Sequence, residues 1–184
     1  MASAKAVFLD RDGVLNEAII RGGKPFSPLT LSEVVVPTDV PNALARLRAN
    51  GYRLIMVTNQ PDIARKKNSR EHVDQINQHL SRILKLDGTE VCDHDDADNC
   101  DCRKPKPGML LRAAKRQGIL LTESFMIGDR WRDIEAGRRA GCRTILIGSG
   151  YDESLISPPD IAVTNLSEAT NWILAQQGNS RDKA

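Results

Sequence analysis

Carboxylates, a hydroxyl and a lysine follow short apolar runs of this sequence. Asp10 and Asp12 come after "AVFL", Thr58 ends "RLIMVT", Lys104 lies in "RKPKPG", and Asp129 comes after "FMIG". Aspartates brought close together repel one another, and their pKa values rise unless a cation lies among them. A hydrated Mg²⁺ ion suits such oxygen ligands. With a lysine and a hydroxyl beside it, the set indicates phosphoryl transfer, in which catalysis is mostly positioning and charge neutralisation.

A second group of possible ligands lies in the loop "CDHDDADNCDC", residues 92–102. Its two close pairs of soft ligands are Cys92, His94, Cys100 and Cys102. This set is typical of tetrahedral Zn²⁺, and because protein atoms would fill all four positions, the predicted zinc is structural. Its expected role is to hold Arg103 and Lys104 in place directly after the loop.

Two other interpretations of this loop compete with zinc. A calcium loop that starts at Asp93 needs glycine at its sixth position and glutamate at its twelfth, where this sequence has Asp98 and Lys104. A disulfide between Cys92 and Cys100 stays open, although it leaves the histidine without a role. The aspartates between the ligand pairs are predicted to form a solvated tip.

The elements that must position these side chains alternate between β-rich runs and helical patterns, which favours an α/β domain around a mostly parallel sheet. Strands are predicted at 6–9, 53–58, 88–92, 124–129, 143–148 and 160–163. Helices are predicted at 40–50, 69–84, 107–117, 132–140 and 166–177. In open α/β sheets, ligands bind beyond the carboxyl ends of the strands, so the predicted site lies at that edge. The long connection at 14–39 is expected to be functional or mobile.

Composition restricts the class of protein. The chain of 184 residues predicts one domain, residues 1–176, with a flexible tail at 177–184. A net charge of +2 and an aromatic content of 4% argue against a nucleic-acid or membrane partner. The N-terminus has no secretory apolar region, and no apolar run approaches the roughly 20 residues of a membrane span. We therefore expect a cytoplasmic monomer, in which disulfides are disfavoured.

Four segments in this order, "FLDRDGVLN", "VTNQ", "RKPKPG" and "GDRWRD", resemble the four motifs of the haloacid dehalogenase (HAD) phosphohydrolase superfamily. The resemblance spans residues 5–165. "DRDG" together with the cysteine loop is similar to the subgroup of D-glycero-D-manno-heptose bisphosphate phosphatases and histidinol-phosphate phosphatases. The resemblance implies a three-layer, Rossmann-like HAD fold. No segment is large enough for a separate cap domain, so residues 14–30 and the zinc-bound loop are expected to wall the site.

The resemblance also implies catalytic roles. Asp10 is the expected nucleophile, which forms an aspartyl-phosphate. Asp12 is the expected acid that protonates the leaving oxygen, and then the base for water. Asp10, the backbone carbonyl of Asp12, and Asp129 would hold Mg²⁺, while Asp133 would steady the waters of the metal. Without the resemblance, Asp10 and Asp12 could be a solvated loop after a strand.

Thr58 and Lys104 match positions that bind the transferring phosphoryl oxygens, where preorganised donors contribute on the order of 3 kcal/mol each. Five further residues are expected to contact the substrate: Arg11, Asn59, Gln60, Arg103 and Arg130. The simpler alternatives are that Thr58 caps the next segment and that Arg130 pairs with Asp133 at a helix start. The expected cofactors are Mg²⁺ and Zn²⁺.

The leading functional hypothesis is removal of the C7 phosphate from D-glycero-D-manno-heptose 1,7-bisphosphate, a small-molecule sugar phosphate. The alternatives are a histidinol-phosphate phosphatase and a non-catalytic zinc-knuckle binding module. After Gln60 the sequence "PDIARKK" departs from the serine-glycine pair usual in the subgroup. Its Arg65, Lys66 and Lys67 form either a solvated charged face or a surface that attracts an anionic substrate.

Overall fold

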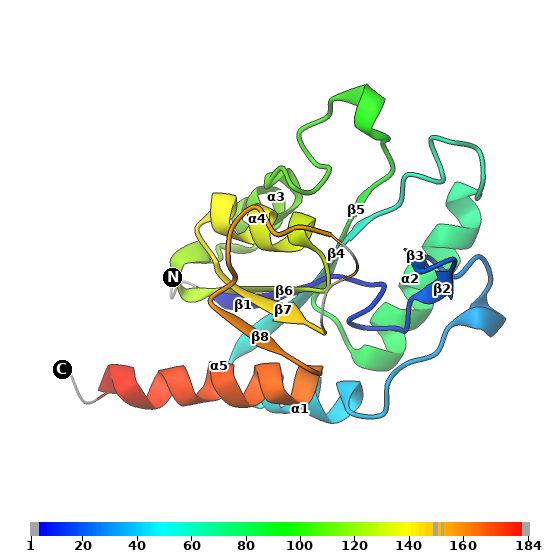
Figure 1. Ribbon diagram of the computed structural model, residues 1–184. Helices are drawn as coiled ribbons and strands as arrows, with labels where there is room; N and C mark the ends of the chain where they lie inside the picture. The colour runs from blue at the N-terminus through cyan, green and yellow to red at the C-terminus, as the bar shows by residue number, and fades with distance from the viewer. Residues whose placement is uncertain (1–3, 149–150, 152, 182–184) are drawn as a thin grey trace.

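The computed structural model describes residues 4–148, 151 and 153–181, with side chains as far as residue 176 (Figure 1). A six-stranded sheet has the strand order β5-β4-β1-β6-β7-β8, and every neighbouring pair is parallel. Its strands are β1 (Lys5–Leu9), β4 (Tyr52–Asn59), β5 (Gly88–Cys92), β6 (Phe125–Gly128), β7 (Arg143–Ile147) and β8 (Ile161–Val163). The predicted parallel α/β fold is confirmed.

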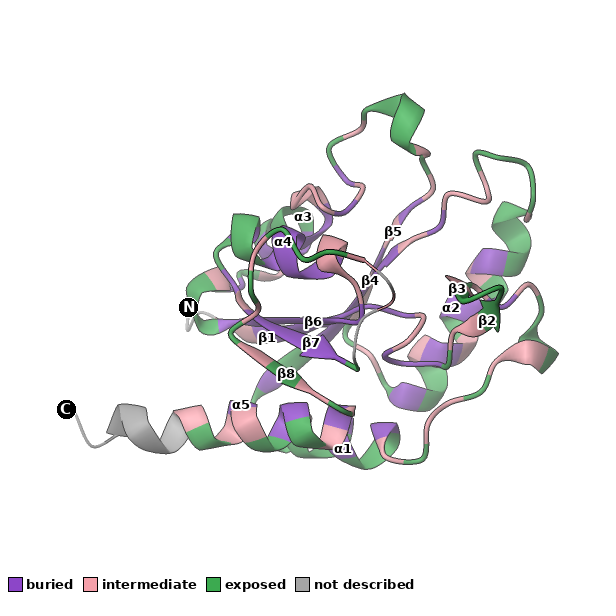
Figure 2. Cartoon of the chain, in the orientation of Figure 1, coloured by how far each residue is buried: buried purple, intermediate pink, exposed green. Residues whose placement is uncertain are grey.

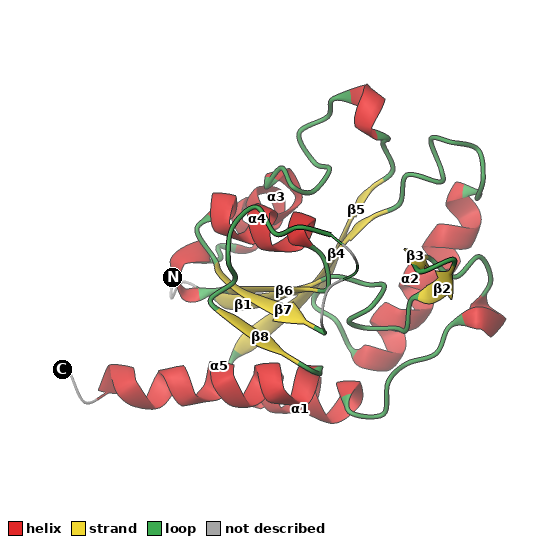
Figure 3. Ribbon diagram, in the orientation of Figure 1, coloured by secondary structure: helices red, strands yellow, loops and turns green. Residues whose placement is uncertain are grey.

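Helices cover both faces of this sheet, which gives three layers (Figure 3). One face packs against α1 (Val40–Ala49), α2 (Arg70–Leu84) and α5 (Leu166–Arg181). The other face packs against α3 (Gly108–Gln117) and α4 (Trp131–Ala140). All predicted strands and helices are present, and except at the end of α5 their bounds differ by no more than one residue from the prediction.

The apolar runs explain the strands. In β1, residues 6–9 have no exposed surface; Val7 and Leu9 join the core under α1, whereas Ala6 and Phe8 join the core under α3 and α4 (Figure 2). A parallel strand buried on both faces has a continuous apolar sequence rather than an alternating one. Helix α2 begins at Ser69, whose side chain accepts a hydrogen bond from the His72 backbone N–H at 3.1 Å.

The connection after β1 contains more order than the sequence indicated. It forms a hairpin of β2 (Ile19–Arg21) and β3 (Lys24–Phe26), followed by a 3₁₀ turn at Leu31–Glu33. Gly22 and Gly23 have φ values of 56° and 74°, a left-handed conformation that only glycine adopts readily in such a tight turn. The strands are too short for their periodicity to stand out in the sequence.

Further short 3₁₀ turns lie at Asp96–Asp98, in the loop of residues 92–102, and at Leu121–Glu123. The tail predicted from residue 177 is helical as far as Arg181, because α5 continues through it, and residues 182–184 lie outside the described part. Within the described part, no helix is both long and apolar enough to span a bilayer.

Helix α4 approaches the sheet closely because residue 137 is glycine. A Cβ atom at Gly137 would lie 2.5 Å from Cβ of Met126 and 2.9 Å from Cγ2 of Thr144. The Gly137→Ala variant should therefore lose about 1–3 kcal/mol of unfolding free energy, as measured by urea denaturation. The exposed Gln78→Ala variant of α2 is the control and should stay within about 0.5 kcal/mol. An unchanged Gly137→Ala midpoint would show that the helix can shift at no cost.

Candidate active site

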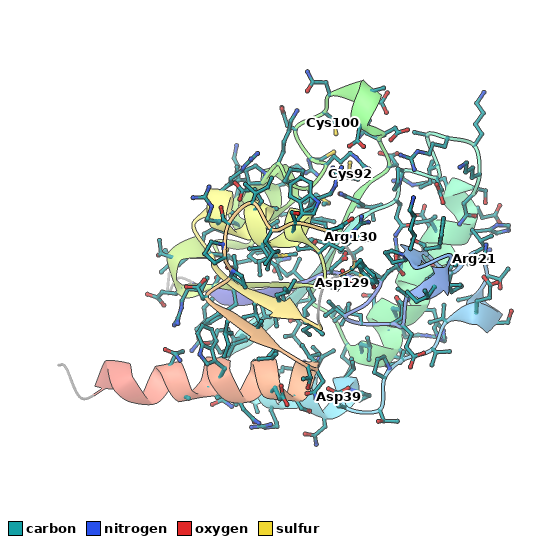
Figure 4. The ribbon with its side chains drawn as sticks, in the orientation of Figure 1. Arg21, Asp39, Cys92, Cys100, Asp129 and Arg130 are labelled. Atoms are coloured by element: carbon teal, nitrogen blue, oxygen red, sulfur yellow. The ribbon has the colours of Figure 1, made fainter. Side chains whose placement is uncertain are left out.

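The candidate site lies where the strand order reverses. Counted along the chain, the six strands stand in the order 3-2-1-4-5-6, so β1 and β6 adjoin although their following helices leave to opposite faces. Asp10 follows β1 and Asp129 follows β6, and the Asp10 backbone N–H donates to the Ile127 carbonyl at 3.0 Å. The sheet therefore brings both carboxylates to one crevice. Figure 4 shows Asp129 beside Arg130 at this edge.

Lys104 is the centre of the charge network. Its ammonium group donates to Asp10 Oδ1 at 2.8 Å and to the Val57 carbonyl at 2.8 Å, and it pairs with Asp133 Oδ1 at 2.6 Å. Burial alone would lower the pKa of Lys104, but the two carboxylates outweigh burial and raise it. The buried lysine stays charged and holds the predicted nucleophile in one orientation.

Asn59 places this lysine. Its side-chain amide donates to the Lys104 carbonyl at 3.1 Å, and its side-chain oxygen accepts from the Lys104 backbone N–H at 3.1 Å. Asn59 is the last residue of β4, so this pair of bonds ties the "RKPKPG" segment to the sheet edge. Asn59 thus supports the lysine as well as lining the cavity, which the sequence analysis did not foresee.

Asp10, Asp129 and Asp133 form a group that fits a divalent cation. Each offers a carboxylate oxygen within 4.8 Å of the others, and in the described residues the Lys104 ammonium group is the one cation that forms an ion pair with them, so three carboxylates share one positive charge. Burial raises the pKa of Asp10 to about 7, with Lys104 opposing and Asp133 adding to the shift. Burial, then the charges of Asp10 and Asp133, raise the pKa of Asp129 to about 8.

Asp129 itself points to an additional ligand. Within the described part of the chain, its Oδ1 atom is buried and has no hydrogen-bond partner, while its Oδ2 accepts from the Tyr151 hydroxyl at 2.8 Å. An orphaned buried carboxylate oxygen is costly unless something outside the protein binds it. Oxygen ligands of this kind suit Mg²⁺, and the cluster therefore fits the predicted ion.

Asp12 faces a different set of partners. Its carboxylate accepts from Asn16 at 3.0 Å, Ser27 at 2.7 Å and Gln60 at 3.1 Å, and it pairs with Arg11 at 2.9 Å. Burial would raise the pKa of Asp12, but the Arg11 charge and these hydrogen bonds lower it. The side chain is thus separate from the cation cluster, so the predicted contact between Asp12 and a metal would have to use its backbone carbonyl.

Arg11 does not line the cavity, which corrects the prediction that it contacts the substrate. It has no exposed surface, its Nη1 donates to Asn77 Oδ1 at 2.9 Å, and its Nε and Nη2 donate to Asp12 at 3.1 and 2.9 Å. Arg11 lies between the catalytic candidates Asp10 and Asp12 in the sequence, but its side chain points into the protein interior. Arg11 therefore orients Asp12 and keeps it ionised from behind.

The other predicted catalytic, magnesium and substrate residues all line one cavity of about 470 Å³. Thr58 is almost fully buried at its base, where its hydroxyl accepts from Gln60 Nε2 at 2.9 Å. Arg130 pairs with Glu153, not with Asp133, whose carboxylate instead accepts from the Arg130 backbone N–H at 3.1 Å. This excludes the surface pair between Arg130 and Asp133 as the alternative role of Arg130.

The cysteine loop converges as predicted. The sulfur of Cys102 lies 3.2 Å from that of Cys92, 3.4 Å from that of Cys100 and 3.3 Å from Nδ1 of His94. The sulfurs of Cys92 and Cys100 are 3.7 Å apart and all four cysteines are free, so the structure has no Cys92–Cys100 disulfide. Four ligands with Zn–S bonds of about 2.3 Å would lie roughly 3.8 Å apart around one ion, close to this arrangement.

The tip of this loop, residues 96–99, is exposed to solvent, as predicted, but Asp95 and Asp96 also form ion pairs that the sequence analysis did not foresee. Asp95 accepts two hydrogen bonds from Arg65 at 2.6 and 2.7 Å. Asp96 accepts from Arg103 at 2.7 Å and from Arg132 at 3.2 Å. Arg65, Arg103 and Arg132 all line the cavity, so these pairs join the loop to the cavity wall. These ion pairs could not be predicted from the sequence, because the partners are separated by up to 36 residues.

Tyr151, Ser27 and Arg132 are further residues at the site that the sequence analysis missed. Tyr151 contacts Asp129, Ser27 contacts Asp12, and the Arg132 guanidinium reaches both Asp96 and the rim of the cavity. For Ser27 there was an indirect signal in the sequence, because it lies in the long connection after β1 that was expected to wall the site. No spacing pattern marks the other two.

Three features are typical of a HAD-type hydrolase: the reversed strand order, the aspartates that follow the first strand, and a lysine that pairs with both Asp10 and Asp133. A family model described as HAD-hydrolase-like matches residues 101–169. The chain is 35% identical over 177 residues to the D-glycero-beta-D-manno-heptose-1,7-bisphosphate 7-phosphatase of Helicobacter pylori strain J99, covering 92% of this chain and 97% of the relative. The enzyme of the same name from Pasteurella multocida is 39% identical, covering 79% and 83%.

A solved structure agrees with these relatives. The D,D-heptose 1,7-bisphosphate phosphatase of B. bronchiseptica, complexed with magnesium and phosphate, superposes with a TM-score of 0.81 at 27% identity, covering 94% of this chain and 99% of that one. The chain belongs to the heptose bisphosphate phosphatase family of HAD phosphatases. It is therefore an enzyme, a phosphatase, rather than a non-catalytic zinc-knuckle module.

The contact between Tyr151 and Asp129 should preorganise the cation cluster. The Tyr151→Phe variant removes only the hydroxyl, and we expect the Mg²⁺ dissociation constant, measured by calorimetry on metal-free protein, to rise about tenfold. Glu153→Gln is the matched control, because it weakens the Arg130 pair in the same segment but leaves Asp129 untouched. Equal Mg²⁺ affinities in the wild type and Tyr151→Phe would show that the hydroxyl plays no part in metal binding.

Proposed function

We propose that this phosphatase removes the C7 phosphate of D-glycero-D-manno-heptose 1,7-bisphosphate, in an Mg²⁺-dependent reaction through an aspartyl-phosphate. The observation that carries the proposal is the Lys104 ammonium group, which binds Oδ1 of Asp10 at the base of the cavity. The names of the two relatives and of the solved structure support the choice of substrate. The free cysteines suit a reducing compartment, which supports a cytoplasmic location.

In the first step, the Asp10 carboxylate attacks phosphorus, and the bond from phosphorus to the sugar oxygen breaks. Lys104 restrains Oδ1 of Asp10, so the other carboxylate oxygen is the one presented to the phosphate. Thr58 donates to a phosphoryl oxygen as charge builds up on it, and the positive charge of the nearby Lys104 ammonium group stabilises the same charge electrostatically. The covalent intermediate divides hydrolysis into two steps of lower barrier.

Asp12 moves the proton in both steps. It donates a proton to the leaving sugar oxygen, and it then removes a proton from the water that hydrolyses the aspartyl-phosphate. Arg11 keeps Asp12 ionised in the free site, which suits the second step. A bound phosphate dianion repels this carboxylate and raises its pKa, which favours the protonated form that the first step needs.

The carboxylates of Asp10 and Asp129 and the backbone carbonyl of Asp12 would hold Mg²⁺, with Asp133 behind them. When bound, Mg²⁺ neutralises part of the charge on the phosphoryl oxygens. The uncompensated charge of the cluster and the unpartnered Asp129 oxygen support this assignment.

A phosphate-release assay with Mg²⁺ tests the substrate and the nucleophile together. We expect turnover of the heptose bisphosphate, slower hydrolysis of hexose bisphosphates and of histidinol phosphate, and a phosphoaspartate trapped by acid quenching. The Asp10→Asn variant should lose at least about 1,000-fold in kcat while keeping its fold. Glu123→Gln, remote from the cavity, is the control. Equal or better activity on histidinol phosphate would overturn the substrate, and failure to trap the ester would overturn the mechanism.

We also propose that Cys92, His94, Cys100 and Cys102 bind a structural Zn²⁺ ion. The purified protein should contain about one zinc per chain, because the folded loop preorganises all four ligands. Cys100→Ser should lose zinc and lower the melting temperature, whereas Cys142→Ser, outside the loop, should keep the metal. Metal analysis and thermal denaturation measure both effects. A zinc-free preparation with full activity and unchanged melting would contradict the assignment.

A further inference from the structure

Helix α2 buries one polar side chain in its apolar face. The residues of this helix that face the core are Val73, Ile76, Asn77, Leu80 and Leu84, and Figure 2 shows buried and exposed residues alternating along it. Asn77 is 4% exposed and does not line the cavity. A buried amide costs free energy unless it is hydrogen-bonded, so a polar residue in this position indicates a specific partner.

The partner of Asn77 is Arg11, on the turn after β1. The Nη1 atom of Arg11 donates to Asn77 Oδ1 at 2.9 Å, while its Nε and Nη2 donate to Oδ1 and Oδ2 of Asp12 at 3.1 and 2.9 Å. All three nitrogens of the guanidinium are therefore engaged. Because a guanidinium is planar, its fork on Asp12 aligns the two planes, and the third bond fixes the orientation of both groups relative to α2.

The backbone holds both ends of this link. The Arg11 carbonyl accepts from the Leu15 backbone N–H at 2.9 Å, which closes the turn. Leu15 lies in the same core as Ile76 and Leu80, the two residues of α2 on either side of Asn77. The turn and the helix thus pack against one core, so the bond between Arg11 and Asn77 joins two fixed elements.

We propose that Asn77 is a positioning residue for proton transfer: it holds Arg11, and Arg11 holds the Asp12 carboxylate in the orientation that the transfer needs. This inference rests on the proposed function, in which Asp12 is the acid and the base. Ser27 and Gln60 also bind Asp12, but both line the cavity, where the substrate must approach. The contact from the interior side is the one that a bound substrate leaves in place.

The type of residue at position 77 matters. An amide oxygen accepts from the Arg11 guanidinium without carrying a charge of its own, so Arg11 keeps its ion pair with Asp12. A leucine side chain of similar size would accept no bond, and Nη1 of Arg11 would become a buried donor without a partner. The guanidinium could then turn towards another acceptor, and the plane of the Asp12 carboxylate would follow it.

The proposed role predicts an effect that depends on the leaving group. A sugar alkoxide is a poor leaving group and needs the proton of Asp12 when its bond to phosphorus breaks. The p-nitrophenolate ion leaves as a stable anion and needs no proton. A misaligned Asp12 should therefore slow cleavage of a sugar phosphate far more than cleavage of p-nitrophenyl phosphate, whereas general damage to the site would slow both.

The test measures single-turnover cleavage of each ester by rapid acid quenching, with enzyme in excess and Mg²⁺ present. In Asn77→Leu, the cleavage rate of the heptose 1,7-bisphosphate should fall about tenfold, part of the roughly 100- to 10,000-fold that general acid catalysis contributes. The rate for p-nitrophenyl phosphate should change less than about twofold. Asn77→Asp, which keeps an oxygen at the same place, should recover part of the rate on the sugar ester.

Thr170→Val is the matched control, because Thr170 is also a buried polar residue of a helix, and within the described part of the chain its hydroxyl has no hydrogen-bond partner. This variant should match the wild type on both esters. Melting temperatures check that every variant folds. If Asn77→Leu is unfolded at the assay temperature, Asn77→Ala, which also lacks the acceptor, carries the same prediction.

Equal slowing of both esters, or no slowing of either, would overturn the positioning role while leaving the phosphatase proposal intact. An Asn77→Asp variant that is no faster than Asn77→Leu on the sugar ester would also overturn it. A wild type that cleaves no heptose ester, or that forms no aspartyl-phosphate, would instead overturn the proposed function and the positioning role with it.

Discussion

The buried ammonium group of Lys104, held between Asp10 and Asp133, is the interaction on which the site depends. Three carboxylates meet at one sheet edge, and without this positive charge their repulsion would oppose folding of the crevice. The lysine is tied to β4 through Asn59, so the sheet itself sets its position. The same lysine fixes the orientation of Asp10, the proposed nucleophile, so one ion-pair network would serve both stability and the proposed catalysis.

The two aspartates of the first motif occupy opposite electrostatic surroundings although one residue separates them. Asp10 lies in the cluster, where burial raises its pKa, and Asp12 lies against Arg11, which lowers its pKa. Groups that perform different proton and nucleophile tasks need different environments. Arg11, buried between them, produces the difference, and Gly13 permits the close approach of Asp129, since a Cβ atom there would lie 2.0 Å from its Oδ2.

Ion pairs connect the cysteine loop to the wall of the cavity. Asp95 and Asp96 at the loop tip hold Arg65, Arg103 and Arg132, so the position of the loop decides how much positive charge the rim presents. These pairs neutralise part of the positive charge on the side of the cavity that faces the loop. The loop therefore shapes charge as well as space, a role that a metal site alone would not explain.

The sequence by itself determined the strand and helix pattern, the parallel sheet and the aspartates, threonine and lysine of the site, because buried parallel strands are continuous apolar runs and ligands lie at their carboxyl ends. The sequence could not determine which side chains pair with one another within the site. That Arg11 points inward, that Tyr151 reaches Asp129 and that Asp96 holds two arginines depends on side chains brought together from distant positions. Such contacts leave no periodic or local signal, so only the tertiary structure decided which charges are paired and which remain available.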